Sequence, residues 1–345
     1  MRITIVYNEP SIWAAAEEAD VLAQVEQVAA TLEANGHTVD RLACGLDLQA
    51  VADAIAADPP DLAFNLVEGL GGYDRLYPLV PSLLDALGVP YTGNSAEAIF
   101  LTTNKLIAKE RLAAAGLPTP AVPARWPEPA NGDPQRGLSP FTPGRYILKP
   151  VWEHASLGMG DDVVVNAASR KRLLARVAEA SARTGREFFA EAFIAGRELN
   201  LSVLDDGRGN GVVLPPAEID FSAYPRHKPR IVGWAAKWDE SSFEFHNTPR
   251  RFDFAESDGP LLDEVMRLAA TCWKLFGLSG YARVDFRVDA AGRPFILEVN
   301  TNPCLTGDAG FPAAAERSGL PFDDAIARIV AAVPVRRRAL VAAAL

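Results

Sequence analysis

The sequence contains little cysteine and no long hydrophobic run. Its three cysteines, Cys44, Cys272 and Cys304, are odd in number and widely spaced, so neither a disulfide framework nor a zinc site is indicated. No apolar stretch is long enough to cross a bilayer. The chain runs directly into a predicted strand, without the apolar core and cleavage site of a signal peptide. We therefore expect a cytoplasmic protein with no membrane partner.

The sequence also lacks an excess of positive charge. It has 34 Lys and Arg residues against 44 Asp and Glu residues, a formal net charge of −10. This balance argues against nucleic acid or an anionic membrane as the main partner. The short basic run at residues 336–338 lies in an alanine-rich tail and is interpreted as part of a helix end. With 345 residues, 49% of them hydrophobic, the chain is long enough for two or three globular domains.

Strands and helices alternate along the first third of the chain. Periodicity predicts strands at residues 3–7, 38–42 and 62–67 and helices at 12–33, 48–57 and 77–87. This alternation is typical of a parallel sheet covered by helices. The loop 68–74 follows a predicted strand, and ligands of such folds collect at the carboxyl ends of strands. Its glycines do not decide the matter, since tight turns also use glycine without a ligand.

The remainder of the chain is richer in strands. A helix is expected at 103–115, followed by a stretch rich in proline and glycine at 118–144. Strands are predicted at 146–151, 163–165, 188–193, 199–204, 212–219 and 231–238. Helices are predicted at 169–183, 261–276, 313–319 and 323–333. No internal repeat is present.

The pair of segments 281–289 and 294–303 is the most informative feature. Both have strand character, and residues 289–293 between them have the turn chemistry of a hairpin. Strict alternation on the second strand predicts two faces, with Phe295, Leu297 and Val299 on the core side and Ile296, Glu298 and Asn300 on the other. Asp285 of the first strand shares that polar side, and such hard oxygen ligands suit Mg²⁺. The alternative is a solvated face on which Arg and Asp side chains pair across the strands. Asparagine is a poor strand former, so Asn300 within a strand favours the metal site.

Two lysines and a turn add signals for a phosphate-bearing ligand. Lys149 ends a predicted strand and precedes the small-residue loop 155–160, an arrangement suited to clamping phosphate. Lys105 opens a predicted helix. The segment 191–198 is predicted as strand, turn and strand, whose backbone could pair with an adenine edge while Glu198 reaches ribose hydroxyls. Each has a simpler alternative, namely lysines that point to water and an exposed charged turn.

In this order and spacing, the segments resemble an ATP-grasp ligase, most closely the D-alanine–D-alanine ligase branch. The resemblance runs from about residue 62 to about residue 330. It rests on the segments at residues 64–72, 88–93, 104–109, 148–150, 234–238, 282–285 and 297–303. It implies an α/β (α+β) ATP-grasp fold with an N-terminal Rossmann-like parallel-sheet domain (1–102). Two α+β subdomains (103–197 and 198–345) would follow and clamp ATP.

The resemblance also implies a role for each matching residue. The metal ligands would be Asp285, Glu298 and Asn300, holding two Mg²⁺ ions, with Mn²⁺ as an alternative. The ATP-binding residues would be Lys105, Lys149, Ser156, Glu191, Ala192, Ile194 and Glu198. The catalytic residues would be Arg283, on the oxyanion of a tetrahedral intermediate, and Lys237, near the γ-phosphate. The substrate-binding residues would be Glu68, Trp238, Asn302 and Ala309.

Departures from that branch lie on the substrate side. The loop at residues 7–11 lacks the family's glycine-rich sequence, and Glu68 stands where a histidine is usual. Further replacements are His154 for glycine, Ala155 for serine, Trp238 for tyrosine, Cys304 for glycine and Ala309 for serine. Because unmatched buried polar groups discriminate strongly between substrates, these changes predict a substrate pair other than two D-alanines. Glu68 would suit a cationic or amine-bearing substrate, or it could hydrogen-bond the amides of its own loop.

The implied function is ATP-dependent joining of a small-molecule carboxylate to an amine, such as amino acids or dipeptide precursors, through an acyl phosphate. Three alternatives remain at this point: a genuine D-alanine–D-alanine ligase, a nucleotide-binding protein without turnover, and a kinase that stops after phosphorylation. A nucleotide-binding protein without turnover is disfavoured, because the expected site residues are intact: Asp285, Glu298, Asn300, Lys149 and Arg283. A kinase is disfavoured because it would not need Arg283. The family is often dimeric, so a homodimer is one expectation, although no sequence pattern identifies an interface.

Overall fold

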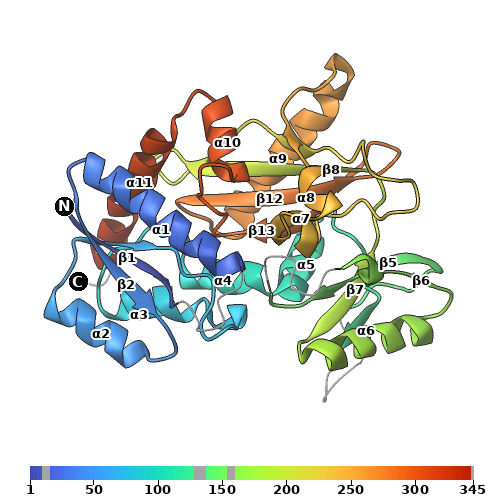
Figure 1. The fold of residues 1–345 in the computed structure, drawn as a ribbon, viewed down its shortest axis with the longest axis horizontal. Coiled ribbons are helices and arrows are strands. Elements are labelled where there is room, and N and C mark those ends of the chain that lie inside the picture. The colour runs from blue at the N-terminus through green and yellow to red at the C-terminus, as the bar shows by residue number, and fades with distance from the viewer. Residues whose placement is uncertain (10–15, 128–136, 154–159, 343–345) are drawn as a thin grey trace.

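The computed structural model describes residues 1–9, 16–127, 137–153 and 160–342. These residues form one parallel and two antiparallel sheets with helices packed against them (Figure 1). The predicted α/β class with an added α+β part is therefore confirmed. The helix predicted at 12–33 begins outside the described residues, and Ser156, Ala155 and His154 also lie outside them.

The first sheet is parallel, with strand order β2-β1-β3. Its strands are β1 (Arg2–Asn8), β2 (Thr38–Cys44) and β3 (Leu62–Asn65), connected by helices α1 (Ala16–Ala34) and α2 (Leu48–Ala57). The helices η1 (Asp74–Leu76), α3 (Leu79–Ala86) and α4 (Ala96–Thr103) follow. Because the strands are parallel, the ends of β1 and β3 lie at the same edge, where the loop 68–74 begins.

One predicted helix has a different beginning. The segment 103–115 contains α5 (Lys105–Ala114), which is separated from α4 by Asn104. The Asn104 side chain accepts hydrogen bonds from the amides of Leu106 and Ile107 at 3.1 and 3.0 Å, so it caps α5. The separate helix α4, capped by Ser95, was not predicted.

The second sheet is antiparallel, with strand order β4-β7-β5-β6. Its strands are β4 (Ala124–Trp126), β5 (Gly144–Pro150), β6 (Val164–Ala167) and β7 (Phe188–Ala192), with a short helix η2 (Asp161–Val163) before β6. Helix α6 (Arg170–Thr184) covers one face and buries Leu173, Val177 and Ala180. This sheet carries Lys149 and Glu191 on neighbouring strands.

The third sheet has strand order β11-β10-β8-β12-β13, with β9 paired to β8. Its strands are β8 (Arg197–Asp205), β9 (Gly211–Val213), β10 (Ala217–Ile219), β11 (Arg250–Arg251), β12 (Tyr281–Val288) and β13 (Pro294–Asn300). The helices of this part are α7 (Trp234–Trp238), α8 (Phe243–His246), η3 (Glu256–Asp258), α9 (Gly259–Leu275), α10 (Gly310–Arg317) and α11 (Phe322–Ala342). The predicted hairpin of β12 and β13 is confirmed.

Two of the predicted strands in this part are wrong. The segment 212–219 is divided between β9 and β10, because Pro215 and Pro216 between them cannot donate ladder hydrogen bonds. The segment 231–238 contains the helix α7 in place of a strand. A short apolar run of this length has no periodicity that separates helix from strand.

The predicted alternation on β13 is also wrong in one detail. The register shifts between Asp285 and Phe286, so that Phe286 pairs with Ile296 whereas Asp285 pairs with Glu298. Leu297 is therefore the extra residue of a β-bulge. Ile296 is fully buried in the core beside Phe286, while Glu298 keeps the predicted polar face opposite Asp285.

The first and last parts of the chain share one core. Ile3, Ile5 and Leu32 pack in the same buried cluster as Tyr281 and residues of the C-terminal helices α10 and α11. Figure 1 shows α1 beside α11, far apart in sequence. This packing fixes the edge of the parallel sheet against the end of β12.

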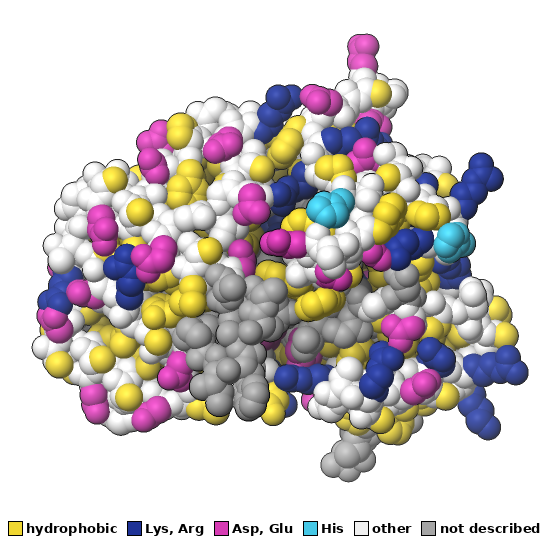
Figure 2. Space-filling view, in the orientation of Figure 1, with side chains coloured by type: hydrophobic (Ala, Val, Ile, Leu, Met, Phe, Trp, Pro, Cys, Tyr) yellow, Lys and Arg dark blue, Asp and Glu magenta, His cyan; other side chains and the backbone are white. Residues whose placement is uncertain are grey.

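No helix among the described residues is both long and apolar enough to cross a membrane. Acidic and basic side chains are interspersed on the face drawn in Figure 2.

Candidate active site

The predicted metal ligands meet on one face of the third sheet. Asp285 lies opposite Glu298 on the paired strand, and Arg283 lies opposite Asn300. Arg283 donates two hydrogen bonds to the Asp285 carboxylate, Nε to Oδ1 at 2.7 Å and Nη2 to Oδ2 at 2.9 Å. Asn200 of β8, which sequence reasoning missed, donates from Nδ2 to Asp285 Oδ1 at 2.7 Å. The Asp285 carboxylate is thus held by Arg283 of its own strand and by Asn200 of the neighbouring strand β8.

The donor set on this face fits a hard divalent cation. Two carboxylates and one amide oxygen are ligands that Mg²⁺ accepts, and this ion usually completes its shell with water and substrate phosphates. Within the described ranges, no group of three or more His, Cys, Asp or Glu side chains is arranged to hold a metal. Asp285, Glu298 and Asn300 would supply protein oxygens to such an ion, and phosphate and water oxygens would supply the rest.

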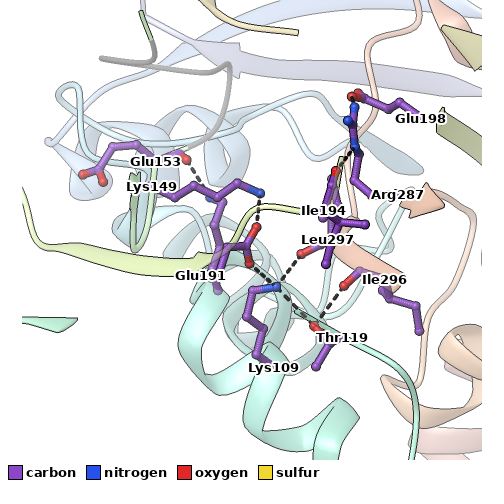
Figure 3. A network of polar contacts seen from close by, with 11 residues as sticks. Lys109, Thr119, Lys149, Glu153, Glu191, Ile194, Glu198, Arg287, Ile296 and Leu297 are labelled. Atoms are coloured by element: carbon purple, nitrogen blue, oxygen red, sulfur yellow. Dashed lines mark hydrogen bonds and ion pairs between the residues drawn. The ribbon is translucent and has the colours of Figure 1, made fainter. Parts of the chain in front are cut away.

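A buried ion network lies between α5 and the second sheet (Figure 3). Glu191 Oε1 is 2.7 Å from Lys149 Nζ, and Glu191 Oε2 is 2.5 Å from Lys109 Nζ. Lys105 donates from Nζ to the carbonyl of Glu153 at 2.6 Å. All three lysines are buried, so the alternative that Lys105 and Lys149 point to water is wrong.

The titration of this network follows from its charges. Burial favours the protonated acid, but Lys109 and Lys149 keep the pKa of Glu191 below its ordinary value. Burial lowers the pKa of Lys109 and of Lys105, whereas Glu191 keeps the pKa of Lys149 above its ordinary value despite burial. Lys109 was not predicted, although its spacing of four from Lys105 places both on one helix face.

The turn predicted to hold adenine is supported by Arg287 of β12, which was not among the predicted site residues. Arg287 donates to the carbonyls of Ile194 and Gly196 at 3.0 and 3.2 Å and to Glu198 Oε2 at 2.9 Å (Figure 3). Burial raises the pKa of Glu198, and Arg287 opposes that effect. Ala192 ends β7 and donates from its amide to the carbonyl of Ala121 at 2.8 Å. The side chain of Glu191 faces the two lysines, so only its backbone remains for the predicted adenine contact.

Glu68 lies on the substrate side, directly after the first sheet. Asn8 holds its loop, accepting from the Glu68 amide at 2.9 Å and donating to the Gly69 carbonyl at 2.6 Å. Burial raises the pKa of Glu68 to about 8, with further contributions from Asp74 and Asp20 against the opposing charges of Lys237 and Arg283. The carboxyl group therefore lies within electrostatic reach of both predicted catalytic cations.

The remaining predicted residues surround this region. Lys237 and Trp238 are in α7, and burial together with Arg283 lowers the pKa of Lys237. Asn302 is buried, with Oδ1 accepting from the Tyr281 hydroxyl and Nδ2 donating to the Val67 carbonyl at 3.4 Å. Ala309 immediately precedes α10. The Asn302 amide is therefore directed at protein groups, and its substrate-binding role remains a prediction.

Cys304 and Asp20 form a further contact that was not foreseen. The thiol donates to Asp20 Oδ2 at 3.3 Å and lies 3.1 Å from Thr306 Oγ1. Burial and the charge of Asp20 raise the pKa of this thiol to about 12, so it stays protonated near neutral pH.

Arg186 connects the substrate-side loop to the lysine network. It donates to Glu153 Oε1 at 3.1 Å and to the Gly72 carbonyl at 2.8 Å, and its guanidinium lies 4.5 Å from the Tyr73 ring centre. The carbonyl of the same Glu153 accepts from Lys105. These contacts join residues distant in sequence, so no local pattern could have indicated them.

A cavity of about 650 Å³ opens between α6 and α7. It is bordered by the end of α6 at Arg183 and Thr184, by Tyr224 and Ile231, and by α7 at Trp234. None of the predicted site residues that the structure describes lines it, although Ala236 of its wall precedes Lys237. The cavity therefore adjoins the candidate site without containing it.

The sequence is similar to known ligases along most of its length. The family model "D-ala D-ala ligase C-terminus" matches residues 146–331. The D-alanine–D-alanine ligase of Desulforudis audaxviator is 32% identical over 306 residues, covering 88% of this chain and 90% of that protein. The enzyme of the same name from Saccharophagus degradans is 32% identical over 288 residues, covering 83% and 82%.

Solved structures show the same fold. A Bacillus anthracis D-alanine–D-alanine ligase complexed with ATP superposes with a TM-score of 0.71 at 22% identity, covering 98% of this chain and 99% of that one. The Coxiella burnetii enzyme gives 0.69 at 18% identity, covering 100% and 97%. Together with the family match and the relatives at 32% identity, these likenesses show that the chain belongs to the D-alanine–D-alanine ligase family and is an ADP-forming ligase of the ATP-grasp type.

Proposed function

We propose that this protein joins a carboxylate to an amine through an acyl phosphate, releasing ADP and phosphate, on substrates other than two D-alanines. The observation that carries the proposal is the face of β12 and β13 on which Arg283, Asp285 and Glu298 lie together. It combines a carboxylate pair for a divalent cation with an arginine for a developing negative charge.

In the first step, a substrate carboxylate oxygen attacks the γ-phosphorus of ATP, and the bond to the ADP oxygen breaks. This reaction requires charge neutralisation more than covalent help. Lys105 and Lys149, held by Glu153 and Glu191, would face the phosphates. Two Mg²⁺ ions, or Mn²⁺, held by Asp285, Glu298 and Asn300 would offset the remaining phosphate charge.

In the second step, the amine attacks the acyl carbon, and the tetrahedral intermediate expels phosphate. Arg283 would stabilise the oxyanion, a contribution of about 3 kcal/mol for one such donor. Its guanidinium is oriented by the bidentate contact with Asp285. Exclusion of water would protect the acyl phosphate from hydrolysis, and the segment of Lys237 on α7 would contribute to that exclusion.

The substrate side supports a pair other than two D-alanines. Glu68 replaces the usual histidine, and it shares its surroundings with Asp20 and Asp74. Ala309 offers no hydroxyl where a serine is usual. A group of neighbouring carboxylates would suit a cationic or amine-bearing substrate, such as an amino acid or a dipeptide precursor. The second candidate is a genuine D-alanine–D-alanine ligase, which the names of the relatives at 32% identity favour.

We further propose that the chain is divided into three domains, at residues 1–102, 103–197 and 198–345. The last two would hold ATP between them. An enzyme of this kind would draw ATP and small-molecule substrates from the cytoplasm. A homodimer is proposed only because members of the family are often dimeric.

The two candidates differ in their products. With Mg²⁺-ATP and a panel of amino acids and carboxylic acids, we expect amide products by mass spectrometry for a pair containing a cationic substrate, and little D-alanyl-D-alanine. Above pH 8, where Glu68 is charged, Glu68→Gln should raise the KM of the cationic substrate by about tenfold, since a charged hydrogen bond contributes roughly 1.5–3 kcal/mol. Because the Glu68 pKa is about 8, that KM should fall as the pH rises through this value.

If D-alanyl-D-alanine is the main product and no other substrate pair gives an amide, the protein is a genuine D-alanine–D-alanine ligase. ADP release that does not depend on added amine would indicate a kinase. Glu316→Gln, at an exposed position on α10, is the matched control and should leave every KM unchanged.

A further inference from the structure

Lys109 lies where two parts of the proposed site meet. Its Nζ is 2.5 Å from Glu191 Oε2, and it donates to Thr119 Oγ1 at 3.1 Å and to the Leu297 carbonyl at 3.2 Å (Figure 3). An ammonium group has three protons, and three acceptors surround it. The side chain is only 4% exposed, so burying this charge has to be offset by those contacts.

The first contact acts on Lys149 through charge. Lys109, Glu191 and Lys149 are 4%, 1% and 9% exposed, and together they carry one excess positive charge. Such an excess in a buried site favours an anion beside Lys149. Without Lys109, Lys149 and Glu191 would form a neutral pair with a weaker attraction for phosphate.

The other contacts act on Glu298 through the β-bulge. Leu297, whose carbonyl accepts from Lys109, is the extra residue of the bulge. Thr119 donates from Oγ1 to the neighbouring Ile296 carbonyl at 2.9 Å. Without an extra residue, positions 296 and 298 would share one face of the strand. The bulge is therefore what allows Ile296 to face the core while Glu298 faces Asp285.

We propose that Lys109 is a positioning residue that couples the two halves of the site, holding Lys149 for the nucleotide and the Leu297 bulge that directs Glu298 to the metal. The inference rests on the nucleotide and metal roles proposed above. It adds that a residue touching neither ligand sets the affinity for both. Thr119 contacts the bulge directly and reaches the nucleotide half only through Lys109.

The test uses binding instead of turnover. The dissociation constant of a non-hydrolysable ATP analogue is measured by calorimetry without metal, and that of Mn²⁺ by electron paramagnetic resonance with the analogue present. Lys109→Met should weaken both by about tenfold to a hundredfold, the range for losing one charge-assisted hydrogen bond. Lys109→Arg, which keeps the charge, should restore most of the analogue affinity. Thr119→Val should weaken Mn²⁺ binding by about threefold or more. Analogue binding should weaken less, because Lys109 keeps its contact with Glu191.

Lys171→Met, at an exposed position on α6, is the control and should change neither constant. A folded Lys109→Met protein with unchanged constants would overturn the proposal, whatever its melting temperature. If Lys109→Met does not fold, unchanged Mn²⁺ binding by Thr119→Val overturns the metal half, and tenfold weaker analogue binding by Lys109→Arg overturns the nucleotide half. Absence of analogue binding by the unaltered protein would overturn the proposed function itself, and this inference with it.

Discussion

Glu298→Gln is expected to abolish ADP formation, lowering turnover by about a thousandfold or more, with the protein still folded. The substitution keeps the shape of the side chain but removes its charge opposite Asp285, where a divalent cation would bridge protein and phosphate. Glu298 lies at the surface of the sheet face and not in the core, so the fold has little dependence on its charge. ADP release with the active substrate pair measures the effect, and circular dichroism checks the fold.

Glu316→Gln again provides the comparison, since it removes an exposed carboxylate of the same type on α10, outside the predicted site residues. Turnover by Glu298→Gln within a few fold of the unaltered protein would refute the metal assignment. Loss of turnover with intact Mn²⁺ binding would place the role of Glu298 elsewhere.

Arg283→Ala is expected to reduce amide formation by about a hundredfold to a thousandfold while changing ATP-analogue affinity much less. The reason is that an oxyanion donor acts in the transition state and contributes about 3 kcal/mol there. The quantity to measure is the ratio of amide product to ADP, which should fall because the acyl phosphate has time to hydrolyse.

Arg283 also orients Asp285, so a second variant separates the two roles. Arg283→Lys keeps a positive charge beside Asp285 but loses the bidentate geometry. Amide formation should stay low in this variant, while Mn²⁺ binding stays close to that of the unaltered protein. A selective loss of analogue affinity in both variants, with an unchanged ratio of amide to ADP, would contradict the oxyanion role.

The ordered motifs were enough to predict the fold class and to bring Asp285, Glu298 and Asn300 onto one sheet face. Hairpin pairing is local, and the turn at 289–293 fixes it within a few residues. The bulge at Leu297 was not predicted because it is stabilised by Lys109 and Thr119, which lie 188 and 177 residues from their acceptors. Period-two alternation contains no information about such distant contacts.

The same limit explains the residues that were missed. Arg287 could be identified only as a polar side chain on β12, whereas its four acceptors lie in the turn and loop 57–93 residues away. The burial of Lys105 and Lys149 could not be predicted from the sequence either, since a lysine at the end of a helix or strand usually faces water. Only the tertiary packing around Glu153 and Glu191 determines that these ammonium groups are enclosed.

The most direct test of the proposed acyl-phosphate ligase follows an oxygen atom. With the active substrate pair, the carboxylate substrate is labelled with ¹⁸O and the released phosphate is examined by mass spectrometry or by ³¹P nuclear magnetic resonance. Attack of the carboxylate on the γ-phosphorus predicts one ¹⁸O atom in each phosphate formed with amide product. Phosphate without the label, at the same rate of amide formation, would contradict the acyl-phosphate route.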